Sequence, residues 1–271
     1  MMISLIIPAY NEQHRLPATL ISYDEVLRGR FGEDYEIVVV ANGCVDDTVE
    51  VTEDLAASRP AIRVIDVPQP VGKGGAIIEG FKYATGDGIV FADADGATAP
   101  GSLVELAEGL YAYDVIVGSR RAAGSAITRS QPPARQAFGL GFNVASRALF
   151  GLRFSDTQCG AKAFRRDAAL AVAEEVVERR WTFDLDLLLT AQKLGLRVRE
   201  HPVRWADKDG SKLPFVPTAW EVSRALASMK LRYSRPKPLA KTAPQTRLSS
   251  NGGAAAAPEA SVRRDRELER V

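Results

Sequence analysis

The sequence predicts an α/β fold built on a mostly parallel, doubly wound sheet. Short apolar runs alternate along the chain with segments of helical periodicity, and the connections between them are short. This alternation is typical of strand–helix–strand units, which place parallel strands side by side. The composition, with 46% hydrophobic and 25% charged residues in a chain of 271, is that of an ordinary globular protein.

The expected strands are short runs of apolar residues. They lie at residues 3–8, 35–41, 62–67, 88–92, 115–118 and 197–203. The expected helices show apolar residues at helical spacing, and Pro17 and Pro100 stand where two of them begin. These helices lie at residues 16–27, 47–58, 74–84, 101–110, 136–149, 167–177, 184–194 and 218–233. Residues 119–135 contain a glycine and two prolines, and we expect them to form a mobile loop over the site.

The end of the chain differs from the rest in composition. Residues 234–271 are rich in Pro, Gly and Ala, and they carry eight Lys or Arg against four Asp or Glu. Such a segment does not contain enough apolar surface to form a core. We therefore expect one folded domain at residues 1–233, followed by a disordered basic tail at residues 234–271.

Charge, cysteine content and hydropathy narrow the class of protein. A net charge of +1 gives no reason to expect a nucleic-acid partner. The two cysteines, Cys44 and Cys159, are too few for a disulfide framework. The sequence starts without a recognisable signal peptide, and no apolar run approaches the roughly 18 residues of a spanning helix. We expect a cytoplasmic protein that meets a membrane only at its surface.

Two aspartates follow the fourth expected strand. In extended backbone Asp93 and Asp95 point to the same side, at the carboxyl end of a buried strand, where open α/β sheets bind ligands. Two carboxylates aimed together repel each other unless a cation lies between them. A Mg²⁺ or Mn²⁺ ion that carries a diphosphate would satisfy both. The alternative is that both residues merely shape a loop and begin a helix.

The nucleotide-binding fingerprints of other α/β proteins are absent. The first strand ends in Pro8-Ala9-Tyr10-Asn11-Glu12 and not in a glycine-rich turn, so the Rossmann pattern fails. Gly72-Lys73-Gly74 lacks the remaining Walker A residues, but it opens a helix, where N–H groups and a lysine favour anions. Asn42, after the second strand, has an amide that could pair with a base edge. Each of these segments could also be an ordinary turn.

In this order and spacing, the motifs resemble the family-2, GT-A-fold inverting glycosyltransferases. The first-half motifs are SLIIPAYNE (Ser4–Glu12), NGCVDDT (Asn42–Thr48), GKG (Gly72–Gly74) and DADG (Asp93–Gly96). The second half is similar to dolichyl-phosphate β-glucosyltransferases and related polyprenyl-phosphate sugar synthases. Its motifs are VGSR (Val117–Arg120), DTQCG (Asp156–Gly160), WTFDLDL (Trp181–Leu187), GSKL (Gly210–Leu213) and LRY (Leu231–Tyr233).

The resemblance implies a nucleotide-sugar donor, with UDP-glucose the first candidate. Asp95, supported by Asp93, would hold Mg²⁺ or Mn²⁺ against the diphosphate. The residues implied for the nucleotide-sugar pocket are Pro8, Ala9, Tyr10, Glu12, Asn42, Lys73, Asp93 and Ala94. The family's usual carboxylate at position 42 is here an amide, which leaves the base preference less defined.

The resemblance also implies a polyprenyl or dolichyl phosphate as acceptor, held by Arg120 and Arg135, with Asp156 and Gln158 nearby. Because a phosphate monoester is mostly a dianion at neutral pH, it needs no strong general base. Asp184 and Asp186 could therefore be catalytic, could orient sugar hydroxyls, or could cap the helix that they open. The alternatives are a family-2 transferase with a hydroxyl acceptor, which would need such a base, and a non-catalytic sugar-nucleotide-binding protein.

The last expected helix raises the question of a membrane surface. Val222, Leu226, Met229 and Tyr233 form an apolar stripe along it, beside basic residues. This pattern suits a helix that lies at a membrane interface, but packing against the core would produce the same stripe. The sequence does not define the oligomeric state, and a homodimer is one candidate.

Overall fold

The structure is a computed structural model, and it describes residues 1–208 and 219–234. The tail expected at residues 234–271 lies outside the described residues, apart from Ser234. No helix in these two described ranges is both long enough and apolar enough to cross a membrane.

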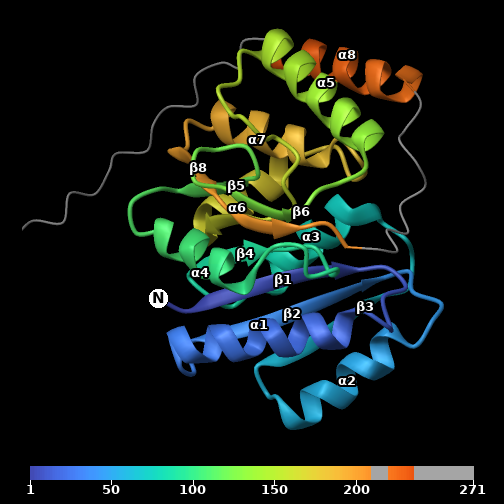
Figure 1. Cartoon of the computed structure of the whole chain (residues 1–271), viewed down its shortest axis with the longest axis vertical. Helices are drawn as coiled ribbons and strands as arrows, with labels where there is room; N and C mark the ends of the chain where they lie inside the picture. The colour runs from blue at the N-terminus through green and yellow to red at the C-terminus, as the bar shows by residue number, and fades with distance from the viewer. Residues whose placement is uncertain (209–218, 235–271) are drawn as a thin grey trace, which may run out of the picture. The chain divides into compact units, whose positions relative to one another are not determined.

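A seven-stranded sheet forms the centre of the molecule, in the order β3-β2-β1-β4-β7-β5-β8 (Figure 1). All neighbouring strands are parallel except β7, which runs antiparallel to both β4 and β5. The prediction of a mostly parallel sheet is therefore confirmed. The strands are β1 (Ile3–Ala9), β2 (Tyr35–Asn42), β3 (Ile62–Val67), β4 (Gly88–Phe91), β5 (Val115–Ser119), β7 (Lys162–Arg165) and β8 (Val198–Pro202).

Helices cover both faces of the sheet because both faces are apolar. Along β1, Leu5 and Ile7 point into a cluster with the first and fourth helices, whereas Ile6 points into a cluster with the third, sixth and seventh. The helices are α1 (Leu16–Phe31), α2 (Thr48–Ser58), α3 (Gly72–Tyr83), α4 (Pro100–Gly109), α5 (Pro133–Phe150), α6 (Arg166–Glu175), α7 (Phe183–Lys193) and α8 (Ala219–Ser234).

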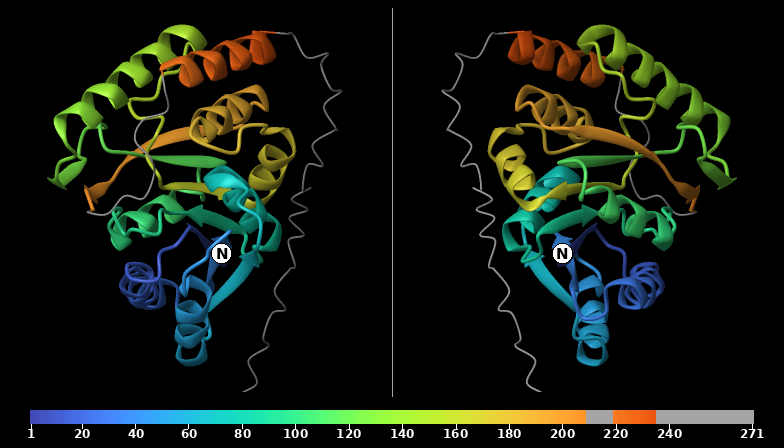
Figure 2. Two further views of the ribbon diagram at one scale, coloured as in Figure 1. Left: turned by 90° about the vertical axis from the view of Figure 1, so that its right-hand side faces the viewer. Right: turned by 90° about the vertical axis from the view of Figure 1, so that its left-hand side faces the viewer.

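Helix α7 is buried on all sides between the sheet and a further layer. Leu187 and Leu188 pack toward the sheet, whereas Leu185 and Leu189 pack toward α5 and α8. Figure 2 shows α5 and α8 together beyond α7, on the side away from the sheet. A helix with apolar side chains on opposite sides needs this kind of enclosure.

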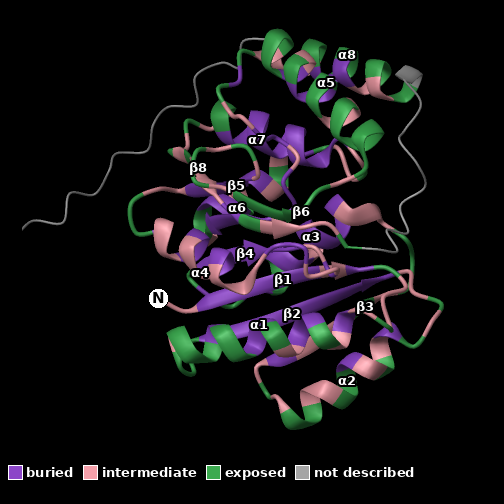
Figure 3. Cartoon of the chain, in the orientation of Figure 1, coloured by how far each residue is buried: buried purple, intermediate pink, exposed green. Residues whose placement is uncertain are grey.

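The apolar stripe of α8 belongs to this layer. Met229 is fully buried and Leu226 nearly so, and Val222 and Tyr233 pack against the same cluster. Figure 3 shows buried and intermediate turns of α8 that alternate with exposed ones. Of the two interpretations offered by the sequence, core packing is the one that the structure supports.

The segment expected to be a mobile loop contains a strand. Strand β6 (Ala126–Arg129) pairs in parallel with β9 (Arg204–Ala206) to form a small second sheet. All four residues of β6 are exposed, so the strand lacks the apolar alternation that would identify it in a sequence. Strand β9 also forms a bridge to Thr98 through Trp205, which places this sheet beside the chain that follows Asp95.

We predict that Gly80→Ala destabilises the fold. Gly80 lies where α3 crosses β1, and a Cβ atom there would be 2.3 Å from Ile6 Cγ2. The overlap should lower the free energy of unfolding by about 1–3 kcal/mol in urea titrations. Gly29→Ala in α1 is the matched control, because no atom lies within 4 Å of its Cβ position. This control should gain about 0.5–1 kcal/mol. Equal effects of the two changes would contradict the close helix–strand contact.

Candidate functional site

The residues predicted for donor binding lie at one edge of the sheet. Strands β1, β2 and β4 end there, at Ala9, Asn42 and Phe91. Strand β7 runs in the opposite direction and therefore starts at the same edge, with Lys162 paired to Phe91. The segments that follow β1, β2 and β4 and the segment that precedes β7 thus surround one region. Open α/β sheets bind ligands in such a region.

Asp93 is held between a lysine and a glycine. Lys73 Nζ, from the first turn of α3, lies 2.5 Å from Asp93 Oδ1. On the other side, a Cβ atom at Gly160 would be 1.9 Å from Asp93 Oδ2, so the carboxylate fits only because this residue is glycine. Burial alone would lower the pKa of Lys73, but the charges of Asp93, Asp184 and Asp95 raise it above its usual value. Lys73 is therefore a permanent cation.

Asp95 lies close to Asp93. One oxygen of Asp95 accepts a hydrogen bond of 2.9 Å from the N–H group of Ala97. Burial, followed by the negative charge of Asp93, raises the pKa of Asp95. Two carboxylates that repel each other are a suitable place for a hard cation. Over the described ranges no three His, Cys, Asp or Glu side chains gather as a metal cluster, so such a cation would need oxygens from a ligand such as a diphosphate.

The glycines of the Gly-Lys-Gly segment allow close packing. Gly72 has a φ of +79°, and a Cβ atom there would lie 2.5 Å from the carbonyl oxygen of Arg179. At Gly74, a Cβ atom would be 2.4 Å from the Phe183 ring. The Gly74 N–H group donates to the Arg179 carbonyl at 2.9 Å, so one donor at this helix start is already in use. Phosphate binding by this segment stays a prediction, and Lys73 is its main charged group.

Asn42 also has a local partner. Its side-chain oxygen accepts a hydrogen bond of 2.7 Å from the N–H group of Val71, the residue before α3. The amide therefore ties the end of β2 to the start of α3. A carbonyl oxygen can accept a second bond, so pairing of Asn42 with a base stays a prediction.

The chain after β1 is anchored to the chain after β2. Asn11 has a φ of +56°, and its side-chain oxygen accepts from the Val45 N–H group at 2.8 Å. The Glu12 N–H group donates to Thr48 Oγ1 at 2.8 Å, and the Glu12 carboxylate pairs with Arg15 at 2.6 Å. The other residues predicted for this pocket differ in exposure: Ala9 and Ala94 are buried, Pro8 is half-buried and Tyr10 is 50% exposed.

Arg120 and Asp156 form a buried, two-pronged ion pair. Arg120 Nε and Nη2 donate to the two carboxylate oxygens of Asp156 at 2.7 and 3.0 Å. Burial would raise the pKa of Asp156, but the hydrogen bonds and charge of Arg120 keep it below its usual value. The Arg120 guanidinium also lies 5.4 Å from the centre of the Trp205 ring. This geometry fixes Arg120 and leaves its other N–H groups for a ligand.

The two remaining residues of the predicted acceptor side are less constrained. Arg135 lies in the first turn of α5 and is exposed. The Gln158 backbone donates to Asp156 Oδ1 at 3.1 Å. Its side-chain nitrogen is buried and meets no acceptor among the residues that the structure describes. That amide could donate to an acceptor molecule.

Lys162 is a site residue that the sequence reading missed. Its side chain is fully buried, and its Nζ atom lies 2.5 Å from Asp184 Oδ1 and 2.6 Å from the carbonyl oxygen of Cys159. The ammonium is also 5.5 Å from the centre of the Phe91 ring. Asp184 is thus neutralised by a buried cation. The available signal was the lysine in DTQCGAK, at the start of a strand that sequence reasoning did not find.

Asp186 supports the structure around it. One of its oxygens accepts from the N–H groups of Val177 and Glu178, both at 2.9 Å. The other accepts from Arg232 at 2.7 Å and from the Tyr233 hydroxyl at 2.5 Å. Asp186 is fully buried and connects α7 to α8. With four donors on its oxygens, a positioning role fits Asp186 better than a catalytic one, although its catalytic role stays an untested prediction.

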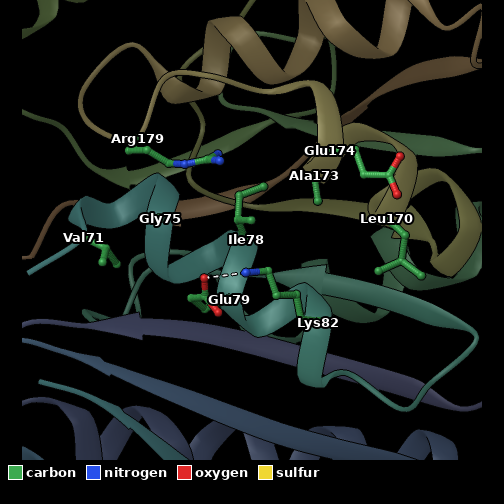
Figure 4. A pocket seen from close by; sticks show the side chains of 9 residues that line it. All are labelled: Val71, Gly75, Ile78, Glu79, Lys82, Leu170, Ala173, Glu174 and Arg179. Carbon is green, nitrogen blue, oxygen red and sulfur yellow. Dashed lines mark hydrogen bonds and ion pairs between the residues drawn. The ribbon is translucent and has the colours of Figure 1, made fainter. Parts of the chain in front are cut away.

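A hollow of about 680 Å³ lies between α3 and α6, next to the Gly-Lys-Gly segment. Figure 4 shows its lining, in which Lys82 pairs with Glu79. None of the predicted site residues lines it. The candidate site is instead the polar edge of the sheet.

We predict that Lys162→Met lowers the free energy of unfolding by about 3–5 kcal/mol, because it leaves a buried carboxylate without a partner. In the double variant Lys162→Met/Asp184→Leu both charges are gone, and most of that loss should be recovered. Urea unfolding followed by circular dichroism measures both. A single variant as stable as the parent would show that the pair contributes little.

We also predict a change in acid stability for Arg120→Gln. Because the pKa of Asp156 is lowered in the folded protein, its ionised form stabilises the fold above the unfolded-state pKa of about 3.9. That contribution is lost as the pH falls through the lower folded-state pKa. Without Arg120, the burial of Asp156 should raise its pKa, so melting temperatures should begin to fall at a higher pH.

Arg197→Gln is the matched control. It breaks a two-pronged pair with Asp114 in which Arg197 is largely exposed. Exposed ion pairs contribute little to stability, so the melting temperature of this variant should fall at nearly the same pH as that of the parent. If the melting temperatures of Arg120→Gln and of the parent fell at the same pH, the buried pair would not be important for acid stability.

The chain is similar in sequence to known proteins. The chain matches the family described as Glycosyl transferase family 2 over residues 4–172. It is 34% identical over 222 residues to a dolichyl-phosphate beta-glucosyltransferase of Trichomonas vaginalis, a match over 78% of this chain and 65% of that protein. The human dolichyl-phosphate beta-glucosyltransferase is 34% identical, over 85% of this chain and 75% of its own length. Glycosyltransferase AglD of Haloferax volcanii is 35% identical over 79% of this chain, which spans about a third (34%) of AglD.

The fold is also that of solved structures. Glucosyl-3-phosphoglycerate synthase from Mycobacterium tuberculosis, in complex with Mn²⁺, UDP-glucose and phosphoglyceric acid, superposes with a TM-score of 0.62. The identity is 20%, and the match covers 87% of this chain and 81% of that one. At this identity the similarity shows a shared fold, which is the predicted GT-A fold. The family match over more than half of the chain shows that this protein belongs to glycosyl transferase family 2.

Proposed function

We propose that this protein is an inverting glycosyltransferase that moves a sugar, with glucose the first candidate, from a nucleotide-sugar to a polyprenyl phosphate. One observation carries the choice of acceptor. The two candidate bases and the carboxylate predicted near the acceptor are all held by cations: Asp184 by Lys162, Asp186 by Arg232 and Asp156 by Arg120. A carboxylate in such a pair is a weak base.

The acceptor must therefore be able to attack without losing a proton to the protein. A phosphate monoester has a second pKa near 6 and is mostly a dianion at neutral pH. A sugar or protein hydroxyl would instead need a general base. The cation-paired carboxylates favour the phosphate, and the similarity to dolichyl-phosphate beta-glucosyltransferases supports the same choice.

Donor binding is assigned to the other half of the site. Asp93 and Asp95 would hold Mg²⁺ or Mn²⁺ with the donor diphosphate, and UDP-glucose is the first candidate donor. A bound divalent ion would neutralise charge that builds up on the leaving diphosphate. Lys73, which stays protonated beside Asp93, adds a second positive charge at the same place. The similar structure with Mn²⁺ and UDP-glucose supports this assignment.

Arg120 and Arg135 are assigned to the acceptor phosphate. The pair with Asp156 orients the Arg120 guanidinium and leaves N–H groups for phosphate oxygens. Arg135 is exposed at the start of α5, where it could meet a phosphate that arrives from outside. We further propose that the acceptor is reached from the cytoplasmic face of a membrane.

A donor panel with polyprenyl phosphate in detergent tests this function. The full chain is incubated with UDP-sugars and GDP-sugars, and the product mass is recorded. We expect the acceptor to gain one hexose, in a reaction that stops when divalent cations are chelated. Asp95→Asn should reduce turnover by about 100-fold or more, since charge compensation at the diphosphate is lost. Asp54→Asn, at an exposed position of α2, is the control and should leave turnover unchanged.

Two outcomes would contradict the proposal. Transfer to soluble hydroxyl acceptors but never to polyprenyl phosphate would support the hydroxyl-transferase alternative. Binding of UDP-glucose without transfer to any acceptor would support a non-catalytic protein.

A further inference from the structure

Glu200 supports the loop that holds Arg120. It lies in β8, which runs parallel to β5, the strand that ends directly before Arg120. Its Oε1 atom accepts hydrogen bonds from the Ser155 N–H group at 2.9 Å, the Ser155 hydroxyl at 2.6 Å and the Asp156 N–H group at 3.0 Å. Three donors thus converge on one oxygen, and they fix the backbone at the residue that pairs with Arg120.

The carboxylate of Glu200 serves only this loop. Among the residues that the structure describes, its oxygens accept from these N–H and O–H groups and form no ion pair. Hydrogen bonds to an ionised acceptor are stronger than those between neutral groups. On the other side of the loop, Asn143 of α5 donates to the carbonyl oxygen of Ser155 at 2.5 Å. The loop is therefore held from two sides.

Two serine hydroxyls extend this network to the turn after β5. The Ser155 hydroxyl donates to Glu200, because an ionised carboxylate can only accept. The hydroxyl oxygens of Ser155 and Ser119 lie 2.9 Å apart, so Ser119 must be the donor between them. The Ser119 oxygen in turn accepts from the N–H groups of Arg121 and Ala122 at 3.1 and 3.0 Å. All these bonds point toward Glu200.

Arg120 lies between the two arms of this network. Its N–H group donates to Asp156 Oδ2 at 3.1 Å, in addition to the two bonds from its guanidinium. The residues before and after it in the chain, Ser119 and Arg121, belong to the serine arm. The same carboxylate, that of Glu200, therefore fixes both the backbone of Arg120 and the partner of its side chain.

We propose that Glu200 is a positioning residue that aims the Arg120 guanidinium at the acceptor phosphate. It acts through Asp156 and through the two serines, and it does not itself touch the substrate. This inference rests on the proposed function, in which Arg120 binds that phosphate, and it deepens it by naming what orients the arginine.

The geometry makes the length of the side chain more important than its charge. Glutamine has a carbonyl oxygen that can take the place of Oε1 and accept from the same donors. Aspartate keeps the charge, but its oxygens are withdrawn by about 1.5 Å, the length of one C–C bond. That withdrawal is enough to break hydrogen bonds of 2.6–3.0 Å. Glutamine should therefore replace Glu200 better than aspartate, whereas a role of charge alone would give the reverse order.

The kinetics of the full chain with polyprenyl phosphate in detergent test this order. Glu200→Ala and Glu200→Asp should raise the acceptor KM by about tenfold or more, since a misaligned guanidinium loses a charge-assisted hydrogen bond to the phosphate. Glu200→Gln should stay close to the parent. The affinity for UDP-glucose with Mn²⁺, measured by calorimetry, should be unchanged in all three variants.

Glu105→Ala is the matched control for the loss of a carboxylate beside β8. Glu105 pairs with His201 and Arg204, which lie close to Glu200 in the chain, but it makes no contact with the 155–156 loop. Its acceptor KM should equal that of the parent.

A double-mutant cycle tests whether Glu200 acts through Arg120. Once the guanidinium is gone, its orientation no longer matters. Glu200→Ala should therefore change the acceptor KM of Arg120→Gln by less than about twofold. A purely structural role would instead multiply the two effects, and that result would overturn the inference.

Trp205 provides a measurement that does not need turnover. The Arg120 guanidinium lies 5.4 Å from the centre of its ring, so the NMR resonance of the indole N–H group reports on that cation. The chain has three tryptophans, and the resonance is assigned by its absence in Trp205→Phe. Arg120→Gln and Glu200→Ala should shift it in the same direction, and Glu200→Gln should shift it much less. In the Arg120→Gln background, Glu200→Ala should cause little further shift.

The outcomes separate this inference from the proposed function. If no lipid phosphate is ever glycosylated, the proposed function fails, and the Trp205 resonance still decides whether Glu200 positions Arg120. If transfer occurs but Glu200→Ala keeps the parent KM and the parent resonance, the function stands and the inference is overturned. Melting temperatures check that the variants fold. If Glu200→Ala does not fold, the comparison of Glu200→Gln with Glu200→Asp decides, and a parent-like Glu200→Asp would contradict the inference.

Discussion

The buried ion pair between Lys162 and Asp184 organises both halves of the site. Lys162 begins the one antiparallel strand of the main sheet, and its ammonium binds the first turn of α7 and the carbonyl oxygen of Cys159. The segment that ends at Cys159 contains the partner of Arg120, and the next residue, Gly160, packs against Asp93. A single lysine thus fixes the loop through which the donor and acceptor residues meet. Since each charge of this pair is buried, neither can be removed alone without leaving the other uncompensated.

Much of the fold could be predicted because the sheet is buried on both faces. Strands such as β1 and β2 are continuous apolar runs, and such runs are visible in a single sequence. Strand β7 was missed because it begins with a lysine and ends with an arginine, and only the surrounding fold shows that Lys162 is buried. Strand β6 was missed because its four residues are exposed. Its pairing with β9 joins segments that are far apart in the chain, which local patterns do not reveal.

The sequence indicated where in the fold the candidate site lies, but it did not indicate which side chains pair with each other there. Asp93 and Asp95 follow β4 as expected, because the end of that strand is easy to identify in the sequence. The partners of these and other residues lie far away in the chain, as Lys73 does from Asp93 and Arg120 does from Asp156. The Gly-Lys-Gly segment shows a further difficulty. Its glycines fit the chain against Arg179 and Phe183, so a pattern that suggests phosphate binding also has a packing cause.

The contact between Lys73 and Asp93 has an electrostatic consequence for ligand exchange. Lys73 and Lys162 offset two of the three carboxylates of Asp93, Asp95 and Asp184, so this part of the site is nearly balanced before any ligand arrives. A bare divalent cation or a bare sugar diphosphate would each change the local charge by two units. A sugar diphosphate that arrives with its cation would change it by none. For the proposed donor, the cluster would therefore favour the neutral complex, and ionic strength should affect its capture far less than that of either ion alone.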